Sequence, residues 1–306
     1  MSSKLQKMAT FKGCLLAHIS FCSLTLFAEP NYQEVKQLID LHFIHKTDYA
    51  NKAAYLEYGN LNLKSLIKSL NEPHSYLKVK GLNTTFFSAK KRCVNNSKIK
   101  LNFQKGKLAY LKVSSIGITT TEEKSQYVRN SINKIRSQDN ENSRYWIIDL
   151  RKNSGGNMWP MLQALSPFFD ATQTLGEFHL SSGSITRFGF KDGIAHESSL
   201  QKINFQPDTY HLKHQPIGIY VLIDSSVASS AEALAIGLSS LENVTLVGEK
   251  TCGLATVNTP FELSDGSILV LTTGEMANIH GQTFKNGITP SMSSLEFIRL
   301  IKDFGE

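Results

Sequence analysis

The chain has 306 residues, of which 41% are hydrophobic and 19% charged, a balance typical of a globular protein and not of a disordered or fibrous one. The formal net charge is +7, but the lysines and arginines are scattered and are not interleaved with aromatic residues. Because a nucleic-acid groove needs clustered basic and aromatic side chains, nucleic acid is not an expected partner.

Residues 1–28 have the pattern of a secretory signal peptide. Three lysines precede the apolar run GCLLAHISFCSLTLFA, and Ala28 offers a small residue at the cleavage point. We therefore expect a cleaved leader and a periplasmic or secreted protein. An uncleaved leader acting as a membrane anchor is the alternative, although the run is short for a full span. Export would permit Cys93 and Cys252 to pair, but the sequence does not show that they meet, and two separate buried thiols are the expected case.

Residues 29–105 are expected to form a small helical N-terminal cap and a connecting segment. A helix is predicted over 31–50, with Asn31 and Glu34 spaced as a capping box. A second helix is predicted over 61–71 and ends before Pro73, which cannot continue a helix. His74 therefore lies in a loop directly after a packed helix. The polar stretch 78–105 predicts a hairpin or loop structure.

Residues 106–306 are expected to form one α/β domain with a mixed sheet and flanking helices. The continuous apolar runs are typical of parallel strands covered on both faces. The predicted strands and helices alternate along the chain. The strands are 108–113, 145–150, 217–224 and 244–249, the helices are 121–137, one after the glycine loop near 156, 230–241 and 294–304, and a hairpin joins 256–263 to 267–276.

Two strand–turn–helix junctions carry the candidate chemistry. DLRKNSGG (149–156) and DSSVASSAE (224–232) each follow a predicted parallel strand, and in open α/β sheets sites form at the carboxyl ends of strands. The second junction places serines at a helix N-terminus, where free backbone N–H groups can bind a developing oxyanion. Taken separately, a serine there is usually only a helix cap and a Gly-Gly pair usually only a turn.

Together these residues resemble a known family. SSVASSAEALAIG followed by VTLVGEKTCGLATVNTPFELSDGSILVLTTGEM is similar to the catalytic segment of the tail-specific, or C-terminal processing, serine peptidases, whose superfamily includes the tricorn core protease. WIIDLRKNSGGNMWPML resembles the glycine-loop segment of that family, and EPHSYL its upstream histidine segment. The resemblance implies a crotonase/Clp-protease-like core.

The resemblance implies a role for each matched position. The family nucleophile falls on Ser229, and the N–H of Ser230 would be one oxyanion donor. The second donor would come from Gly155 or Gly156, between which the sequence does not decide. Glu232 would orient the turn and take no part in the chemistry.

The sequence departs from the family where Ser-Lys peptidases carry a T-x-G-K lysine. Here the motif is TCGL, and Leu254 cannot accept a proton. Lys250 lies nearby, but its pKa would need strong lowering before it could act as a base. His74 is the alternative base, as in the tricorn-like branch, because imidazole titrates near neutrality.

A third group should hold the imidazole in one tautomer. Asn258 matches an amide position of the family, and Ser75 and Asn286 are the other possibilities. Only about thirty residues separate the histidine segment from the first core strand, too few for the PDZ domain of many processing peptidases. The terminal GI-x-P-D pattern ends in Ser291 here.

The sequence therefore predicts an exported serine peptidase that hydrolyses peptide bonds in a protein or peptide substrate. No metal or cofactor is expected, because the chain has no HExxH, Walker or dinucleotide-binding motif. Two alternatives stay open: a non-catalytic peptide- or lipid-binding protein that retains the peptidase fold, and an esterase-like hydrolase.

Overall fold

The computed structural model describes residues 30–45, 62–81, 85–89, 93, 108–117, 119–198 and 203–303. The proposed leader, residues 1–28, lies outside the described residues. In the ranges that are described, no helix is both long and apolar enough to cross a bilayer.

From residue 108 onward the observed elements follow the predicted alternation, except over 173–197, where three strands were not predicted. The helices are α1 (Tyr32–His42), α3 (Leu63–Ser69), α4 (Thr121–Gln138), α5 (Met158–Gln163), the 3₁₀ helix η1 (Ser166–Phe168), α6 (Ser230–Leu238) and α7 (Ser294–Asp303). The strands are β1 (Tyr76–Lys78), β2 (Thr85–Phe87), β3 (Leu108–Lys112), β4 (Tyr145–Asp149), β5 (Gln173–Leu180), β6 (Ile185–Lys191), β7 (Ile194–Glu197), β8 (Gly218–Ile223), β9 (Val244–Gly248), β10 (Thr256–Glu262) and β11 (Ile268–Ala277).

The strands form two sheets, and the predicted α/β class is confirmed. A parallel sheet has the order β3-β4-β8-β9, and an antiparallel sheet has the order β2-β1-β11-β5-β6-β7, with β10 paired to β11. Parallel and antiparallel pairing are thus separated into two sheets instead of sharing one. The parallel strands are the apolar runs that the sequence predicted, and α6 packs between them and β5 with every one of its residues buried.

The strands β5, β6 and β7 were not predicted from the sequence. Two glycines interrupt the strand pattern, and close packing leaves no room for a side chain at either position. A Cβ on Gly176 would lie 2.5 Å from the Phe188 ring, and a Cβ on Gly189 would lie 2.0 Å from the Gln173 carbonyl oxygen. Glycine lowers strand propensity, so packing within the sheet outweighs the local signal here.

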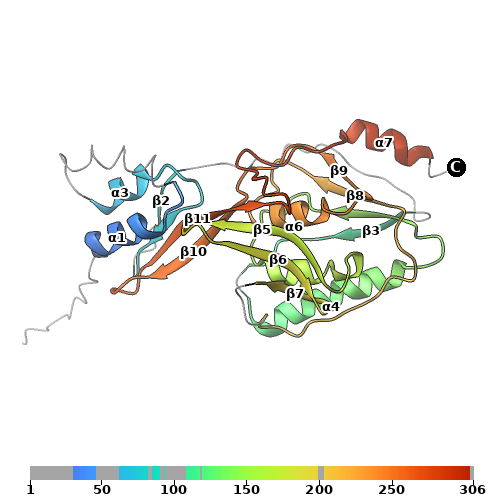
Figure 1. Cartoon of the computed structure of the whole chain (residues 1–306), viewed down its shortest axis with the longest axis horizontal. Helices are drawn as coiled ribbons and strands as arrows, with labels where there is room; N and C mark the ends of the chain where they lie inside the picture. The colour runs from blue at the N-terminus through green and yellow to red at the C-terminus, as the bar shows by residue number, and fades with distance from the viewer. Residues whose placement is uncertain are drawn as a thin grey trace, which may run out of the picture.

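The N-terminal cap packs on a hairpin from the other end of the chain. In Figure 1 the β10–β11 hairpin extends from the centre of the molecule to α1 and α3. Side chains of both regions form one apolar cluster, which we call the cap cluster: Val35, Ile39, Phe43, Leu66, Ile67, Leu70, Leu77, Val79, Leu263, Leu269 and Leu271. The cap and the hairpin therefore share a core, and the loop between α3 and β1, with His74, is fixed against β10 and β11.

Candidate active site

Ser229 is held in a backbone conformation that is rare for a residue with a side chain. It is the N-cap of α6, with φ 55° and ψ −125°. A non-glycine residue in such a region costs on the order of 1–3 kcal/mol and persists only where its surroundings enforce it. The Ser229 N–H donates to Glu232 Oε2 at 3.0 Å, which contributes to holding the turn.

Glu232 joins this turn to the segment 251–254. Besides Ser229, its carboxylate accepts hydrogen bonds from Thr251 Oγ1 (2.5 Å), Gly253 N–H (2.8 Å) and Leu254 N–H (2.7 Å). Burial raises the pKa of Glu232, and these hydrogen bonds oppose that increase. The contacts agree with the prediction that Glu232 orients the turn.

A disulfide ties the same segment to the rest of the chain. Cys252, between two of the residues that donate to Glu232, pairs with Cys93 at a Cα–Cα distance of 5.3 Å, within the usual range for a disulfide. The expectation of two separate thiols is therefore wrong. Sequence spacing could not show the pairing, because 159 positions separate the two cysteines.

The glycine loop lies directly beneath the serine turn. Ala228 N–H donates to the Asn153 carbonyl at 3.2 Å, which links the two junctions. A Cβ on Gly155 would lie 2.9 Å from the Ser229 Cβ, and a Cβ on Gly156 would lie 2.2 Å from the Ile116 carbonyl oxygen. Both glycines also have positive φ, 95° and 116°. This close approach explains why no larger residue stands at either position.

The two candidate glycine donors differ in their hydrogen bonding. Gly155 N–H donates to Asn153 Oδ1 at 2.9 Å, so it is already engaged. Among the residues that the structure describes, neither Gly156 N–H nor Ser230 N–H has a hydrogen-bond partner. The Ser230 hydroxyl donates to the Gly156 carbonyl at 2.7 Å and holds the two segments together. Of the two glycines, Gly156 is therefore the better candidate donor.

His74 is half-buried and is oriented by two neighbours. Its Nδ1 lies 2.7 Å from Thr256 Oγ1, and its backbone N–H donates to Glu72 Oε1 at 3.2 Å. Burial lowers the pKa of His74 below its ordinary value of 6.5, and the Glu72 carboxylate opposes this in part. The imidazole is therefore neutral at neutral pH and has one nitrogen that can accept a proton.

Thr256 occupies the place for which Asn258, Ser75 or Asn286 was expected from the sequence. Asn258 Oδ1 instead accepts from Thr272 Oγ1 at 3.2 Å, and Ser75 Oγ donates to the same threonine at 3.2 Å. Asn286 is exposed. Thr256 was missed because a threonine in a strand has no distinctive motif and lies 182 positions from His74.

One pocket of about 360 Å³ collects most of the candidate residues, and we call it the Ser229 pocket. Its lining includes Ser229, Ser230, Gly156, Thr256 and Asn258. His74 joins it through its contact with Thr256. Within the described part of the chain, no hydrogen bond joins His74 directly to Ser229. The structure thus brings Ser229, the N–H groups of Gly156 and Ser230, and Asn258 to one pocket, and the His74 imidazole contacts Thr256 in its lining.

Neither Leu254, where the family resemblance would place a lysine, nor the nearby Lys250 supplies a base. Leu254 lies beside the serine turn, with its N–H bound to Glu232. Lys250 is exposed and is not among the residues that line the Ser229 pocket.

Comparisons with known proteins concern the family and the fold of the chain. A family model described as peptidase family S41 matches residues 107–294. The carboxy-terminal processing protease CtpA of Bacillus subtilis is 25% identical over 215 residues, which cover 70% of this chain and 41% of that protein. The nisin-resistance protein of Lactococcus lactis is 29% identical over 149 residues, covering 46% and 42% respectively. The chain therefore spans about two fifths of the length of these relatives.

The fold is also found in a solved structure. A lipoprotein from Streptococcus agalactiae superposes with a TM-score of 0.60 at 20% sequence identity, covering 89% of this chain and 94% of that one. At this level of identity the similarity concerns the fold alone.

Proposed function

The chain belongs to peptidase family S41, and on that premise we propose that it is an exported serine peptidase with Ser229 as nucleophile and His74 as general base. The observation that carries this proposal is the Ser229 pocket. A strained serine at a helix N-terminus lines one cavity together with two backbone N–H groups that have no partner among the described residues, and an oriented neutral imidazole contacts Thr256 in the lining of the same cavity.

In the proposed reaction, the Ser229 hydroxyl attacks the carbonyl carbon of a peptide bond while His74 accepts its proton. Thr256 Oγ1 supports this by binding Nδ1, which leaves Nε2 to face the reaction. Because no hydrogen bond links the two side chains directly, substrate binding or a change of side-chain rotamer must bring the imidazole into reach.

The negative charge on the former carbonyl oxygen would be stabilised by the N–H groups of Gly156 and Ser230. Losing one such donor typically costs about 10²–10³ in rate. His74 then returns the proton to the leaving amine, and a water molecule activated by the same imidazole hydrolyses the acyl-enzyme.

The proposed location outside the cytoplasm has two supports. The first 28 residues have the pattern of a cleaved leader, and the Cys93–Cys252 disulfide is typical of an oxidising compartment.

Labelling with a fluorophosphonate probe tests the nucleophile and the base. We expect wild-type protein to be labelled at Ser229, no labelling in Ser229→Ala, and labelling at least about 100-fold slower in His74→Ala. Ser240→Ala and His214→Ala are matched controls at sites outside the Ser229 pocket and should label like wild type. An unlabelled wild-type protein that still binds peptides would contradict catalysis and favour a binding protein. Turnover of esters without cleavage of peptides would favour an esterase.

A further inference from the structure

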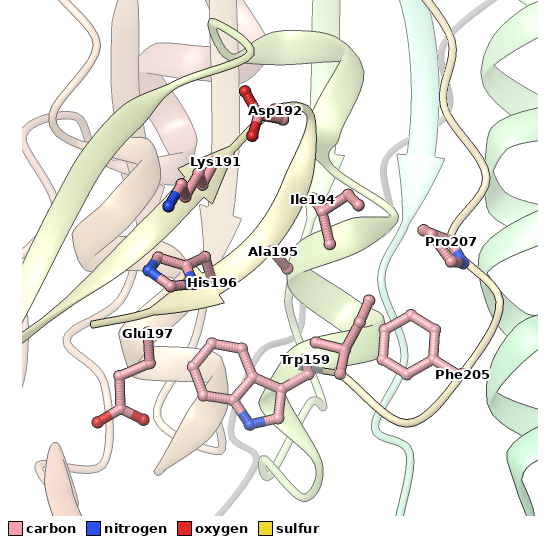
Figure 2. Close-up of a pocket in the computed structure, with 10 residues that line it drawn as sticks. Trp159, Lys191, Asp192, Ile194, Ala195, His196, Glu197, Phe205 and Pro207 are labelled. Carbon is pink, nitrogen blue, oxygen red and sulfur yellow. The ribbon is translucent and has the colours of Figure 1, made fainter. Parts of the chain in front are cut away.

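A second hollow adjoins the Ser229 pocket, and we call it the Trp159 hollow. It has a volume of about 290 Å³, and Trp159 and Glu197 line both it and the Ser229 pocket. Figure 2 shows its walls: β7 on one side, and the Trp159 indole with the Phe205 ring on the other. Because the two cavities share lining residues, a peptide bound across Ser229 can place a neighbouring side chain in this hollow.

The chemistry of the Trp159 hollow is mainly apolar. Besides Trp159, its lining includes Ile194, Ile203, Phe205 and Pro207. Phe205 is buried, whereas Ile194 on β7 is 38% exposed, so the hollow is open to an incoming group. Concave sites lined by aromatic and aliphatic side chains, with a few polar groups at the edge, are typical of ligand pockets.

The polar edge of the hollow comes from Lys191 at the end of β6, from Asp192 in the β6–β7 turn, and from His196 and Glu197 of β7. Lys191 and Asp192 carry opposite charges and are exposed, so they give this side of the edge no net charge. Glu197, between the two cavities, accepts a hydrogen bond from Thr186 Oγ1 at 2.8 Å. The apolar walls suit an uncharged side chain of a bound peptide, and the polar edge suits the backbone of that peptide.

We propose that the Trp159 hollow is a substrate subsite that takes an apolar, preferably aromatic, side chain of a peptide cleaved at Ser229. This inference rests on the proposed function and specifies its substrate class. Burying one such side chain is worth about ten- to a hundred-fold in affinity. The enzyme therefore selects peptides by a residue at a fixed distance from the scissile bond, as well as by the residues next to that bond.

Intrinsic fluorescence can report occupancy directly, because the chain has only two tryptophans. Trp146 is fully buried in the core, so a ligand in the hollow changes the emission of Trp159 alone. The experiment uses the full-length Ser229→Ala protein, which binds without cleaving. It is titrated with peptides that are identical except for one Phe or Ser, whose position is moved along the peptide. We expect Phe at one position to tighten binding about ten- to a hundred-fold over Ser, with an emission change that Trp159→Phe removes.

Charge placed in the hollow should remove this preference. Ile194→Glu introduces a carboxylate at a position that is 38% exposed, so folding is preserved, and Ile203→Glu introduces one at a second, partly buried residue of the lining. Ile217→Glu is the matched control, because Ile217 is 55% exposed and precedes β8, at the end of the sheet away from Ser229. In the active enzyme, the Phe-over-Ser ratio of kcat/KM should fall to within about two-fold in both hollow variants and stay unchanged in the control.

The outcomes separate this inference from the proposed function. Equal binding of Phe and Ser peptides at every position, or a preference that survives both hollow variants, overturns the subsite. A clear preference in binding that the hollow variants remove, without cleavage by the wild-type enzyme, supports the subsite and contradicts the peptidase. Cleavage without any Phe preference supports the peptidase and overturns the subsite.

Discussion

At the scale of single residues, the site depends on a few buried polar groups that act on Ser229 and His74. The carboxylate of Glu232 bonds the Ser229 N–H and two N–H groups of the neighbouring segment, so one side chain stabilises the strained turn. On the other side of the pocket, two residues orient His74. Glu72 accepts a hydrogen bond from its backbone N–H, and Thr256 contacts Nδ1 of its imidazole. A change in either carboxylate should therefore affect catalysis without any contact to the substrate.

Glu72→Gln should shift the pH dependence of the enzyme to lower pH. Burial lowers the pKa of His74 below 6.5 and the Glu72 carboxylate raises it, so removing that charge lowers it further. Glutamine keeps an oxygen for the His74 N–H. The acidic limb of kcat/KM, which reports the free enzyme, should lie below pH 6.5 in wild type and lower still in the variant.

The same titration affects stability. Because the pKa of His74 is lowered by folding, the folded state binds fewer protons than the unfolded state near this pKa. The free energy of unfolding that neutral His74 contributes is therefore lost as the pH falls below about 6.5. The free energy of unfolding of Glu72→Gln should thus fall further than that of wild type in this range. Glu34→Gln, in the cap but bonded to Ser264, is the control. In the kinetic measurement, a shift of the acidic limb of kcat/KM to higher pH in Glu72→Gln would show that His74 is not the group that titrates.

Residues of the candidate site could be named from the sequence where a motif marks them. Ser229, Ser230 and the glycine pair lie in two recognisable junctions, and His74 follows the end of a helix that Pro73 fixes. The choice between Gly155 and Gly156 needed the Asn153 side chain, which engages only the first. Contacts between residues far apart in the chain, such as that of Thr256 with His74, leave no local signal.

At the scale of elements, the segment 251–254 connects α6 to the disulfide. Its backbone donates to Glu232 at two positions, and Cys252 N–H donates to the Val227 carbonyl at 2.9 Å, just before the serine turn. The disulfide therefore fixes a segment that in turn fixes the N-terminus of α6. A loss of this covalent link should weaken the turn as well as the fold.

The Cys93→Ser/Cys252→Ser double variant tests this connection. Removing the link between residues 159 positions apart should lower the free energy of unfolding by about 2–4 kcal/mol. The rate of labelling at Ser229 should fall too, because the donors to Glu232 are less well held. Thermal unfolding and labelling kinetics, each with and without reductant, give the measurement. Reductant should reproduce both effects in wild type and leave the double variant unchanged, whereas equal stability of the two proteins would contradict the role of the disulfide.

The elements themselves were predicted unevenly, for a physical reason. Parallel strands such as β4 and β8 are continuous apolar runs because both faces are covered, and they were found at nearly their observed bounds. The strands β5–β7 belong to an antiparallel sheet with glycines at close contacts and a bulge between Thr174 and Gly176, so their pattern is weaker. The Trp159 hollow lies beside these strands and was missed with them.

At the scale of the whole molecule, the proposed catalytic pair combines two separately packed parts. His74 follows α3 in the cap, whereas Ser229 precedes α6 in the main core. The cap cluster lies between α1, α3 and the β10–β11 hairpin, and Ile44 N–H donates to the Thr272 carbonyl at 3.0 Å beside it. The position of the imidazole therefore depends on packing at the end of the molecule opposite α7 (Figure 1).

Two buried phenylalanines allow a matched test of this dependence. Phe43 lies in the cap cluster, and Phe297 of α7 packs against the parallel sheet with Leu108 and Ile147; both are almost fully buried. Truncation of either to alanine should cost about 3–5 kcal/mol of unfolding free energy. Only Phe43→Ala should also slow labelling of Ser229 at a temperature where both variants stay folded, because it loosens the support of His74.

Hydrogen exchange should locate the loosened regions in each variant. In Phe43→Ala we expect faster exchange in α1, α3, β1 and the β10–β11 hairpin, with β4 and β8 unaffected, since local openings follow separately packed units. In Phe297→Ala the faster exchange should be confined to α7 and the neighbouring parallel strands, without slower labelling. Equal slowing of labelling in both variants would mean that the site responds to global stability alone. Unchanged labelling in Phe43→Ala, despite faster exchange in the cap, would instead show that Ser229 reacts without His74.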